Sequence, residues 1–252
     1  MDSTAEDLAS YLVQQLKLCV YFSETNAAWF DSHWQASKAV GERLLVAIAG
    51  VPASGKSSLA ELVVAKVNTF LAADSTTHPP SAILVGLDGW HLTRAQLDAM
   101  LDPKLAHDRR GAHWTFDGPS YVEFAKLLRQ PATAVITAPS FDHALKDPTP
   151  HAVSIYPSHR LIVIEGLYSM LKHDVWEQGA QLMDERWWIQ VDLEEAKRRL
   201  VKRHVLTGVA KDMEEAIWRA GENDEPNGKF IAENLYEPTR IIKSLDDPKY
   251  IL

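Results

Sequence analysis

The sequence is poor in cysteine and in positive charge, and each shortage excludes a class of protein. The 252 residues include one cysteine, Cys19, so no disulfide can form within the chain and a cysteine-based zinc site is excluded. Lysine and arginine number 26 against 34 aspartates and glutamates, a formal net charge of −8, which argues against a general nucleic-acid-binding protein. No apolar run approaches the roughly 20 residues of a membrane-spanning helix. We therefore expect partners other than nucleic acid or a membrane.

Basic residues are also missing from the start of the chain. Residues 1–7 are acidic and do not resemble the basic start of a signal or transit peptide, so we expect a cytoplasmic protein. With 252 residues, 46% of them hydrophobic, the chain can bury a sizeable core. No internal repeat, low-complexity tract or linker divides it. We expect one domain over residues 1–252, with an N-terminal helical extension at 1–40 and a core at 44–245.

One glycine-rich stretch stands out from the rest of the sequence. Residues 50–57 read Gly-Val-Pro-Ala-Ser-Gly-Lys-Ser and fit the pattern Gly-x-x-x-x-Gly-Lys-Ser/Thr. In this pattern backbone N–H groups surround phosphate oxygens, the lysine approaches the β- and γ-phosphates, and the final hydroxyl binds Mg²⁺. The residues that we expect to contact a nucleotide here are Gly50, Ala53, Ser54, Gly55, Lys56, Ser57 and Ser58.

The flanks of this stretch supply the context that the pattern requires. The apolar run 44–49 precedes it, as a buried parallel strand would. After it, apolar residues recur at helical spacing through Phe70. A phosphate group would then lie at a helix N-terminus, where free N–H groups and the helix dipole favour negative charge.

Further apolar runs alternate with helical segments, which predicts a parallel sheet with helices on both faces. The remaining elements are less regular: we expect helices at 92–102 and 121–128 and a short strand at 134–138. The proline-containing segment 144–160 predicts an irregular excursion. The runs that predict strands are 82–87, 161–164, 187–191 and 240–243, and further helices are expected at 194–204, 213–220 and 230–235.

The N-terminal extension contains two parts. Residues 4–20 carry apolar residues at helical spacing, and residues 21–40 hold Phe22, Trp29, Phe30 and Trp34, which suggest a second helix. The simpler interpretation is a structural cap on the domain. The alternative is an aromatic surface that meets a partner or a second subunit. Under this alternative the protein could form a homodimer.

Three acidic residues follow predicted strands: Asp88, Glu165 and Asp192. Ligands of parallel sheets bind at the carboxyl ends of the strands, where Asp88 and Glu165 fall. Phosphoryl transfer requires charge neutralisation and an oriented nucleophile. We assign Asp88 as the base and Glu165 to the metal side, although the two roles could be exchanged. The alternative for all three is helix capping, which is the interpretation we prefer for Asp192.

Cations cluster in the predicted helix 194–204. Arg199 and Arg203 lie four residues apart on one face, and Gly208 ends the segment. The cluster is either a solvated surface or a lid that closes over a nucleotide, with Arg199 and Arg203 as the better candidates. The ten histidines show no His-x-x-x-His or other metal spacing, so we expect no zinc. His91, Arg110, Asp142 and His143 lie in or near loops that follow strands, where acceptor contacts are expected.

Four segments together resemble the phosphoribulokinase/uridine kinase family of P-loop kinases. They are 50–57, Asp-Gly-Trp-His at 88–91, Arg-Gly-Ala-His-Trp-Thr-Phe-Asp at 110–117 and Ile-Glu-Gly at 164–166. The second and third segments are similar to those of type I pantothenate kinases and bacterial fructose-transport-type kinases, and 199–204 lies where such kinases carry the lid.

The resemblance covers residues 44–245 and implies a three-layer P-loop fold with a doubly wound, mainly parallel sheet of about five strands and a helical lid. It implies ATP with Mg²⁺ as donor and a small hydroxyl-bearing metabolite as acceptor. Trp90 and the pair His113-Trp114 depart from the family pattern. These departures affect the expected acceptor more than the reaction. By the family pattern Asp88 is the catalytic carboxylate, and Arg110, Asp117, Asp142 and His143 lie near the acceptor.

Two other functions remain open. A nucleotide-dependent ATPase or switch would use the same phosphate loop without a small-molecule acceptor. No Asn-Lys-x-Asp guanine-binding pattern is present, and no Asp-Glu pair ends the strand at 161–164 as in typical motor ATPases. A nucleotide-binding protein that acts through its aromatic N-terminal segment is the third interpretation.

Overall fold

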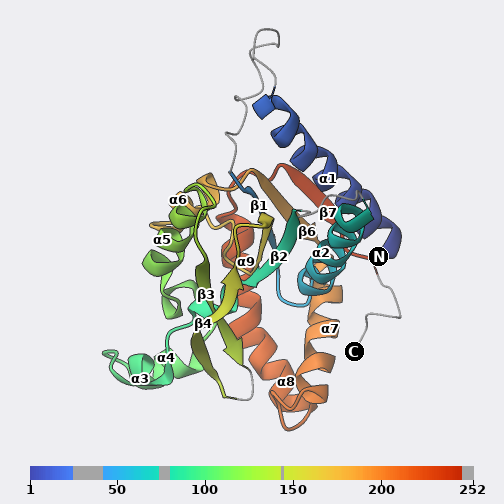
Figure 1. The fold of residues 1–252 in the computed structure, drawn as a ribbon. Helices are drawn as coiled ribbons and strands as arrows, with labels where there is room; N and C mark the ends of the chain where they lie inside the picture. The colour runs from blue at the N-terminus through green and yellow to red at the C-terminus, as the bar shows by residue number, and fades with distance from the viewer. Residues whose placement is uncertain (25–41, 74–79, 143–144, 246–252) are drawn as a thin grey trace.

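The computed structural model describes residues 1–24, 42–73, 80–142 and 145–245 (Figure 1). Within residues 18–24 only the backbone is described. Most of the aromatic segment 21–40 therefore lies outside the described residues, as does His143. No described helix is both long and apolar enough to cross a lipid bilayer.

A five-stranded parallel sheet forms the centre of the structure, which confirms the predicted α/β class. Its strand order is β2-β5-β1-β6-β7, and every neighbouring pair is parallel. The strands are β1 (Leu44–Gly50), β2 (Ser81–Gly86), β5 (His159–Glu165), β6 (Glu185–Gln190) and β7 (Arg240–Lys243).

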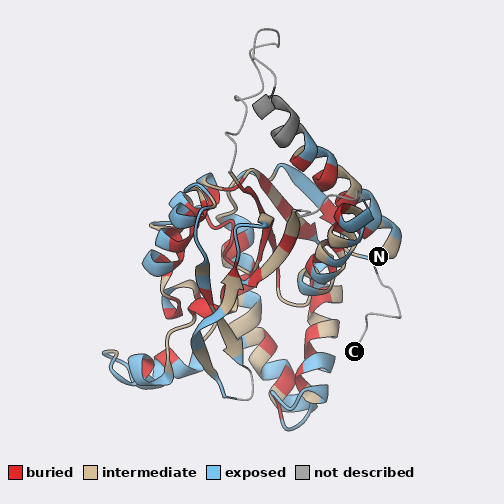
Figure 2. Cartoon of the chain, in the orientation of Figure 1, coloured by how far each residue is buried: buried red, intermediate tan, exposed pale blue. Residues whose placement is uncertain are grey.

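Helices cover both faces of this sheet, because its central strands alternate between two apolar cores. Leu44 and Val46 of β1 point into one core, with α1 (Asp2–Glu24) and α2 (Lys56–Ala73). Leu45 and Ala47 point into the other. The buried strands lie between these layers in Figure 2. The helices of the second layer are α5 (Gly118–Leu128), α6 (Trp176–Gln181) and α9 (Glu225–Glu233).

A buried carboxylate connects α1 to the sheet. Glu185, at the start of β6, accepts hydrogen bonds from the Tyr11 hydroxyl (2.6 Å), the Trp187 indole (3.0 Å) and the Thr239 hydroxyl (2.6 Å). The Arg240 guanidinium lies 4.5 Å from the centre of the Tyr11 ring. These contacts agree with the interpretation of residues 4–20 as a structural helix.

The expectation of an irregular segment at 144–160 is wrong. β3 (Ile136–Asp142) and β4 (Asp147–Ile155) form an antiparallel hairpin in which Phe141 pairs with Pro148. Proline cannot donate a hydrogen bond to a neighbouring strand, so it is tolerated only where no partner requires one. In a two-stranded hairpin each strand has one edge that pairs with no other strand. Prolines on that free edge do not prevent the pairing of β3 with β4.

The segment after β2 contains two short helices in place of the single helix expected there. The predicted helix at 92–102 extends only over α3 (Arg94–Asp98), and a second short helix, α4 (Pro103–Asp108), follows it. Asp102 accepts a hydrogen bond from the Leu105 N–H and Pro103 occupies the first turn, so the signal for α4 was present as an N-cap followed by proline.

The cationic segment forms α7 (Leu193–Leu206), which Asp192 caps by accepting from the Glu195 N–H. This is the capping role preferred for Asp192. α8 (Met213–Arg219) runs through a π-helical turn (Ala220–Asp224) directly into α9, so one continuous helical stretch replaces the two predicted helices.

Replacing Glu185 by alanine is expected to lower the free energy of unfolding by about 1–3 kcal/mol, because the buried Trp187 indole and the hydroxyls of Tyr11 and Thr239 would lose their acceptor. Thermal or urea denaturation measures this change. Glu123→Ala is the control, since the Glu123 side chain is 70% exposed, and it should stay within about 0.5 kcal/mol of the wild type. Equal stabilities of the two variants would contradict the anchoring role.

Candidate active site

The glycine-rich stretch forms a tight loop between β1 and α2. β1 ends at Gly50 and α2 begins at Lys56, which confirms the strand–loop–helix context. Ala53 and Gly55 have positive φ values of 60° and 86°. Alternation of this kind turns successive N–H groups toward one side and creates a concave site for anions. The loop therefore has the backbone geometry that phosphate binding requires.

A buried serine in this loop also fits a bound phosphate chain. Ser54 is fully buried, yet its Oγ has no hydrogen-bond partner among the described residues. A buried hydroxyl without a partner is costly, so it indicates a place that a ligand oxygen can satisfy.

Helices that follow β6 pack on the same loop. A Cβ on Gly228 of α9 would lie 3.3 Å from Pro52 Cδ, and Ala53 packs against the apolar cluster of α7 and α8. The helices after β6 thus cover this loop.

The strand order brings the two predicted carboxylates to the same edge of the sheet. Glu165 ends β5, which lies between β1 and β2, and it pairs in register with Ile48 on one side and Gly86 on the other. Asp88 lies two residues beyond Gly86, in the 3₁₀ turn Leu87–Trp90. The phosphate loop, Glu165 and Asp88 therefore follow three adjacent strands.

Glu165 interacts with the first residues of α2. Burial raises the pKa of its carboxyl group and the Asp88 carboxylate raises it further, whereas Lys56 and a hydrogen bond with Ser57 lower it. The Ser57 hydroxyl and the Glu165 carboxylate provide oxygen ligands, which is the chemistry that Mg²⁺ prefers. These two side chains, beside a phosphate loop, fit a magnesium ion.

Asp88 is open to solvent, while its surroundings are rigid. Its side chain is 50% exposed, and His91 Nδ1 lies 2.9 Å from the Asp88 carbonyl oxygen and 3.9 Å from Oδ1. The His91 ring packs against the rings of Phe116 and Phe141, with centroid distances of 3.9 Å and 4.8 Å. A Cβ on Gly89 would lie 2.4 Å from the carbonyl oxygen of Pro139 in β3, so the hairpin holds this turn closely.

The other residues predicted near the acceptor make contacts within the fold. Arg110 donates to the carbonyl oxygens of Lys146 (2.5 Å) and Leu92 (2.8 Å). Burial lowers the pKa of its guanidinium, and the nearby Asp147 partly offsets this effect. Asp117 caps α5 by accepting from the Ser120 N–H, and Asp142 accepts from the Leu145 N–H. Of these three, Arg110 approaches the Phe141 ring, at 5.2 Å.

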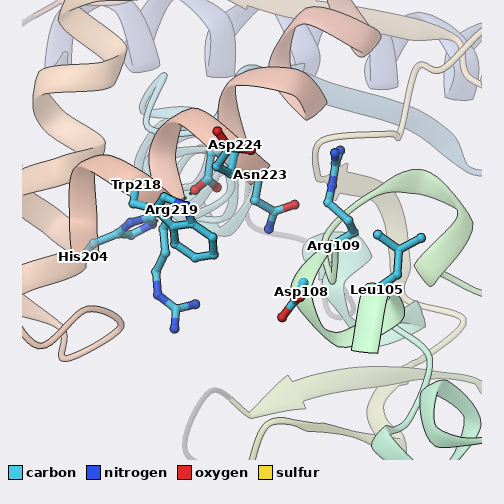
Figure 3. Close-up of a pocket in the computed structure, with 9 residues that line it drawn as sticks. Leu105, Asp108, Arg109, His204, Trp218, Arg219, Asn223 and Asp224 are labelled. Carbon is cyan, nitrogen blue, oxygen red and sulfur yellow. Dashed lines mark ion pairs between the residues drawn. The ribbon is translucent and has the colours of Figure 1, made fainter. Parts of the chain in front are cut away.

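A cavity of about 330 Å³ lies between α4 and the helices that follow β6 (Figure 3). Arg109, rather than Arg110, lines it. Arg109 Nη2 donates to Asn227 Oδ1 at 3.3 Å, and its buried Nε has no partner among the described residues. The lining residues are Leu105, Asp108, Arg109, His204, Trp218, Arg219, Glu222, Asn223 and Asp224.

Most residues of this cavity, including Arg109 and those of the π-helical turn, carry no signal in the sequence patterns. Asn223 Nδ2 donates to the Arg110 carbonyl at 2.9 Å, and Asn227 Nδ2 donates to Asn223 Oδ1 at 3.2 Å. The turn is thereby bound to the loop after α4. No pattern in the sequence indicates that Arg109 lines the cavity whereas Arg110 contacts Leu92 and Lys146, because both residues belong to an irregular segment.

The two lid candidates have different surroundings. Arg199 Nε donates to Glu195 Oε1 at 2.7 Å, and its Nη1 donates to Ser244 Oγ at 2.9 Å, which links α7 to the residue after β7. Arg203 is exposed at the surface of α7 and interacts electrostatically with Asp224.

Gly50→Ala is expected to destabilise the protein by about 1–3 kcal/mol, because the new Cβ would lie 2.5 Å from Ser54 Oγ and 3.0 Å from the Ile189 carbonyl oxygen. Denaturation measures the loss. The control is Gly86→Ala at the end of β2, where a Cβ meets nothing within 4 Å. If the two variants had equal stability, this result would contradict the close packing of Gly50 against Ser54 and Ile189.

Comparisons with known proteins agree with this geometry. An ATP-dependent kinase-like protein of Aspergillus versicolor is 48% identical over 151 residues, which are 59% of this chain and 88% of that protein. A candidate uridine kinase of Schizosaccharomyces pombe is 30% identical over 204 residues, covering 81% of this chain and 84% of that protein. No family model matches the chain.

Solved structures show the same fold. A candidate fructose transport system kinase from a Silicibacter species matches with a TM-score of 0.71 and 25% identity, covering 93% of this chain and 98% of that chain. YFH7 of Saccharomyces cerevisiae, described as a candidate P-loop kinase with a circular permutation, matches with a TM-score of 0.72 and 21% identity. It covers 97% of this chain and 98% of that chain.

These relatives are named as kinases, so they support phosphotransfer with ATP as the activity of this chain, without defining its acceptor. The sheet order and the position of the phosphate loop agree with this family. The chain belongs to the phosphoribulokinase/uridine kinase family of P-loop kinases.

Proposed function

We propose that the protein transfers the γ-phosphate of Mg-ATP to a hydroxyl group of a small metabolite. The observation that carries this proposal is the position of the phosphate loop, Glu165 and Asp88 at the carboxyl ends of three adjacent parallel strands. We further propose that residues 1–252 act as one cytoplasmic kinase domain, with 44–245 as the core. The single cysteine is consistent with a reducing compartment.

The loop supplies the donor site. The N–H groups of its residues, which include Gly50, Ala53 and Gly55, surround phosphate oxygens, and the buried Ser54 hydroxyl is available to one of them. Ser57 and Ser58 lie in the first turn of α2, where N–H groups are free. Lys56 neutralises charge that develops on the transferred group.

Ser57 and Glu165 are the residues that would hold magnesium. When bound, the ion neutralises phosphate charge and helps to align the transferred group. The interaction of Glu165 with both Ser57 and Lys56 favours its assignment to the metal side rather than as the base.

Asp88 then takes the role of the base. Its half-exposed carboxylate can accept a hydrogen bond from an acceptor hydroxyl and take its proton as the bond to phosphorus forms. The packing of His91 between two aromatic rings and the close approach of Pro139 to Gly89 hold the turn that carries it. A fixed carboxylate lowers the cost of aligning the nucleophile.

The acceptor is expected beside this turn. His91, Arg110, Asp117, Asp142 and His143 stay our candidates for its neighbours, and Arg199 and Arg203 for a lid that excludes water. The contacts of Arg110 and Asp117 within the fold favour an indirect role, in which they shape the site. Acceptors to test first are ribosides such as uridine and nicotinamide riboside, then pantothenate and sugars.

Lys56→Ala is expected to reduce phosphoryl transfer by about 10²-fold or more, because a preorganised charge at the transferred phosphate would be lost. A coupled assay of ADP formation measures this effect. Lys66→Ala serves as the control, since Lys66 lies ten residues further along α2 and pairs with Glu6 of α1 at 3.5 Å. A Lys56→Ala enzyme with wild-type turnover would remove the loop lysine from the mechanism.

Asp88→Asn is expected to bind ATP normally and to lose turnover, since the amide keeps the shape of the carboxylate but cannot take a proton. Nucleotide titration and steady-state kinetics separate the two effects. Asp98→Asn on α3, where the side chain is 68% exposed, should leave both unchanged. Near-normal turnover of Asp88→Asn would exclude it as the base.

A metabolite screen distinguishes a kinase from an ATPase or a nucleotide-dependent switch. We expect ADP release to rise sharply with one acceptor class and to stay low without it. If ATP is hydrolysed at the same rate with and without every compound, the acceptor proposal fails and an ATPase or switch is favoured.

A further inference from the structure

Arg110 connects the 3₁₀ turn that carries Asp88 (the Asp88 turn) to the hairpin β3–β4. Its Nη2 donates at 2.8 Å to the carbonyl oxygen of Leu92, two residues after the turn. Its Nη1 donates at 2.5 Å to the carbonyl oxygen of Lys146, directly before β4. Asp147 Oδ1 also lies 3.5 Å from Nη2. One guanidinium thus bridges the hairpin and the segment that follows the turn.

A second arginine holds the same carboxylate. The N–H and the Nε of Arg94, at the start of α3, donate to the Asp147 carboxylate at 2.8 Å and 2.9 Å. Charge-assisted bonds in a network constrain their groups more than an isolated surface pair does. The Arg110 side chain is only 16% exposed, so these contacts define its position.

Phe141 of β3 contacts both Arg110 and His91. The Arg110 Cζ lies 5.2 Å from the centre of the Phe141 ring, within the range of a cation–π contact. The same ring lies 4.8 Å from the His91 ring, centre to centre. On its other contact the His91 ring meets the buried Phe116 at 3.9 Å. The imidazole is thereby fixed by one aromatic ring of the hairpin and one of the segment that follows Arg110.

The imidazole in turn holds the backbone of Asp88. The Asp88 carbonyl oxygen accepts from the His91 N–H at 3.1 Å, and His91 Nδ1 lies 2.9 Å from the same oxygen. A carbonyl oxygen can only accept, so the hydrogen of the ring must be on Nδ1. The position of this ring therefore sets the orientation of the residue whose carboxylate is the proposed base.

The guanidinium of Arg110 has little left to offer an acceptor. Each Nη already donates to a carbonyl oxygen of the fold, and the Nε is buried, although no described residue accepts from it. A group of the acceptor would have to displace these partners. Direct contact with the acceptor, the alternative role of Arg110, would therefore break bonds that the free protein already makes.

We infer that Arg110 is a positioning residue for Asp88: it holds Phe141 against His91, and His91 in its Nδ1–H form fixes the Asp88 turn. This inference rests on the proposed function, since the alignment affects catalysis only if Asp88 is the base. A misaligned base weakens the transition state and leaves substrate binding intact, so the effect belongs in kcat rather than in KM.

Steady-state kinetics with Mg-ATP and the acceptor found by the metabolite screen tests this role. Arg110→Met is expected to lower kcat about tenfold or more and to leave both KM values within about twofold of the wild type. Phe141→Leu should lower kcat to the same extent, whereas Phe141→Tyr, which keeps the ring, should not. The double variant Arg110→Met/Phe141→Leu should lose no more than either single variant, because both act through one contact.

Arg186→Met is the matched control. The Arg186 guanidinium also lies over an aromatic ring, 5.3 Å from the centre of Tyr236, and it also donates to two carbonyl oxygens, those of Glu237 and Met183. It belongs to the start of β6, at the opposite edge of the sheet from the Asp88 turn. Its replacement removes the same kinds of contact and should leave kcat unchanged.

Nitrogen NMR of the full chain, labelled with ¹⁵N at histidine, tests the inference without nucleotide or acceptor. The His91 signal is identified by its loss in His91→Gln. In the wild type and in Arg186→Met we expect the Nδ1–H form of His91. In Arg110→Met and Phe141→Leu the released ring should shift toward the Nε2–H form, because which nitrogen carries the hydrogen depends on the bond that the ring makes.

The outcomes are separable. If wild-type His91 has the Nε2–H form, or if Arg110→Met changes neither this form nor kcat, the positioning role is refuted while the kinase proposal stands. A rise in the acceptor KM that exceeds the fall in kcat also refutes it, since Arg110 would then bind the acceptor directly. If the wild type transfers phosphate to no acceptor, the proposed function itself fails. If Arg110→Met does not fold, the wild-type form of His91 and the two Phe141 variants decide.

Discussion

The parallel pairing of β5 between β1 and β2 is the constraint on which the candidate site depends. Glu165 lies in register with Ile48 and Gly86, so the phosphate loop and the turn that carries Asp88 must start at the same edge of the sheet. Apolar residues on both faces of these strands hold that register, because a slip of one residue would exchange the two cores. The packing of the two cores thus fixes the relative positions of the phosphate loop, Glu165 and Asp88.

Two carboxylates with raised pKa values lie in the part of the structure around Lys56. Burial raises the pKa of the Glu165 and Asp224 carboxyl groups, and the positive charge of Lys56 lowers both pKa values. Glu165 also interacts with the Ser57 hydroxyl, whereas Asp224 lies 3.6 Å from His204 Nε2 of α7. The two carboxylates therefore have different surroundings.

Several elements were predictable from local pattern. The strands at 44–49, 82–87 and 161–164 read as apolar runs, and the loop at 50–57 has a spacing that few other structures require. The strand predicted at 134–138 overlaps β3, but its partner β4 was not predicted, because Pro148 and Pro150 are compatible with a strand only when its outer edge is free. The expected roles of Arg110 and Asp117 rested on a motif, and the motif does not say that both side chains contact the fold.

The fold class, the phosphate loop and the family resemblance could be predicted from the amino-acid sequence, because they depend on periodicity and on residues adjacent in the chain. Which charged side chains meet depends instead on how the helices and strands pack. Asp224 lies 3.6 Å from His204 Nε2, and Arg109, which donates to Asn227 Oδ1, lines the cavity where Arg110 does not. The pair of Arg109 and Asn227 is 118 positions apart in the sequence, and its geometry depends on helix packing that no local pattern encodes.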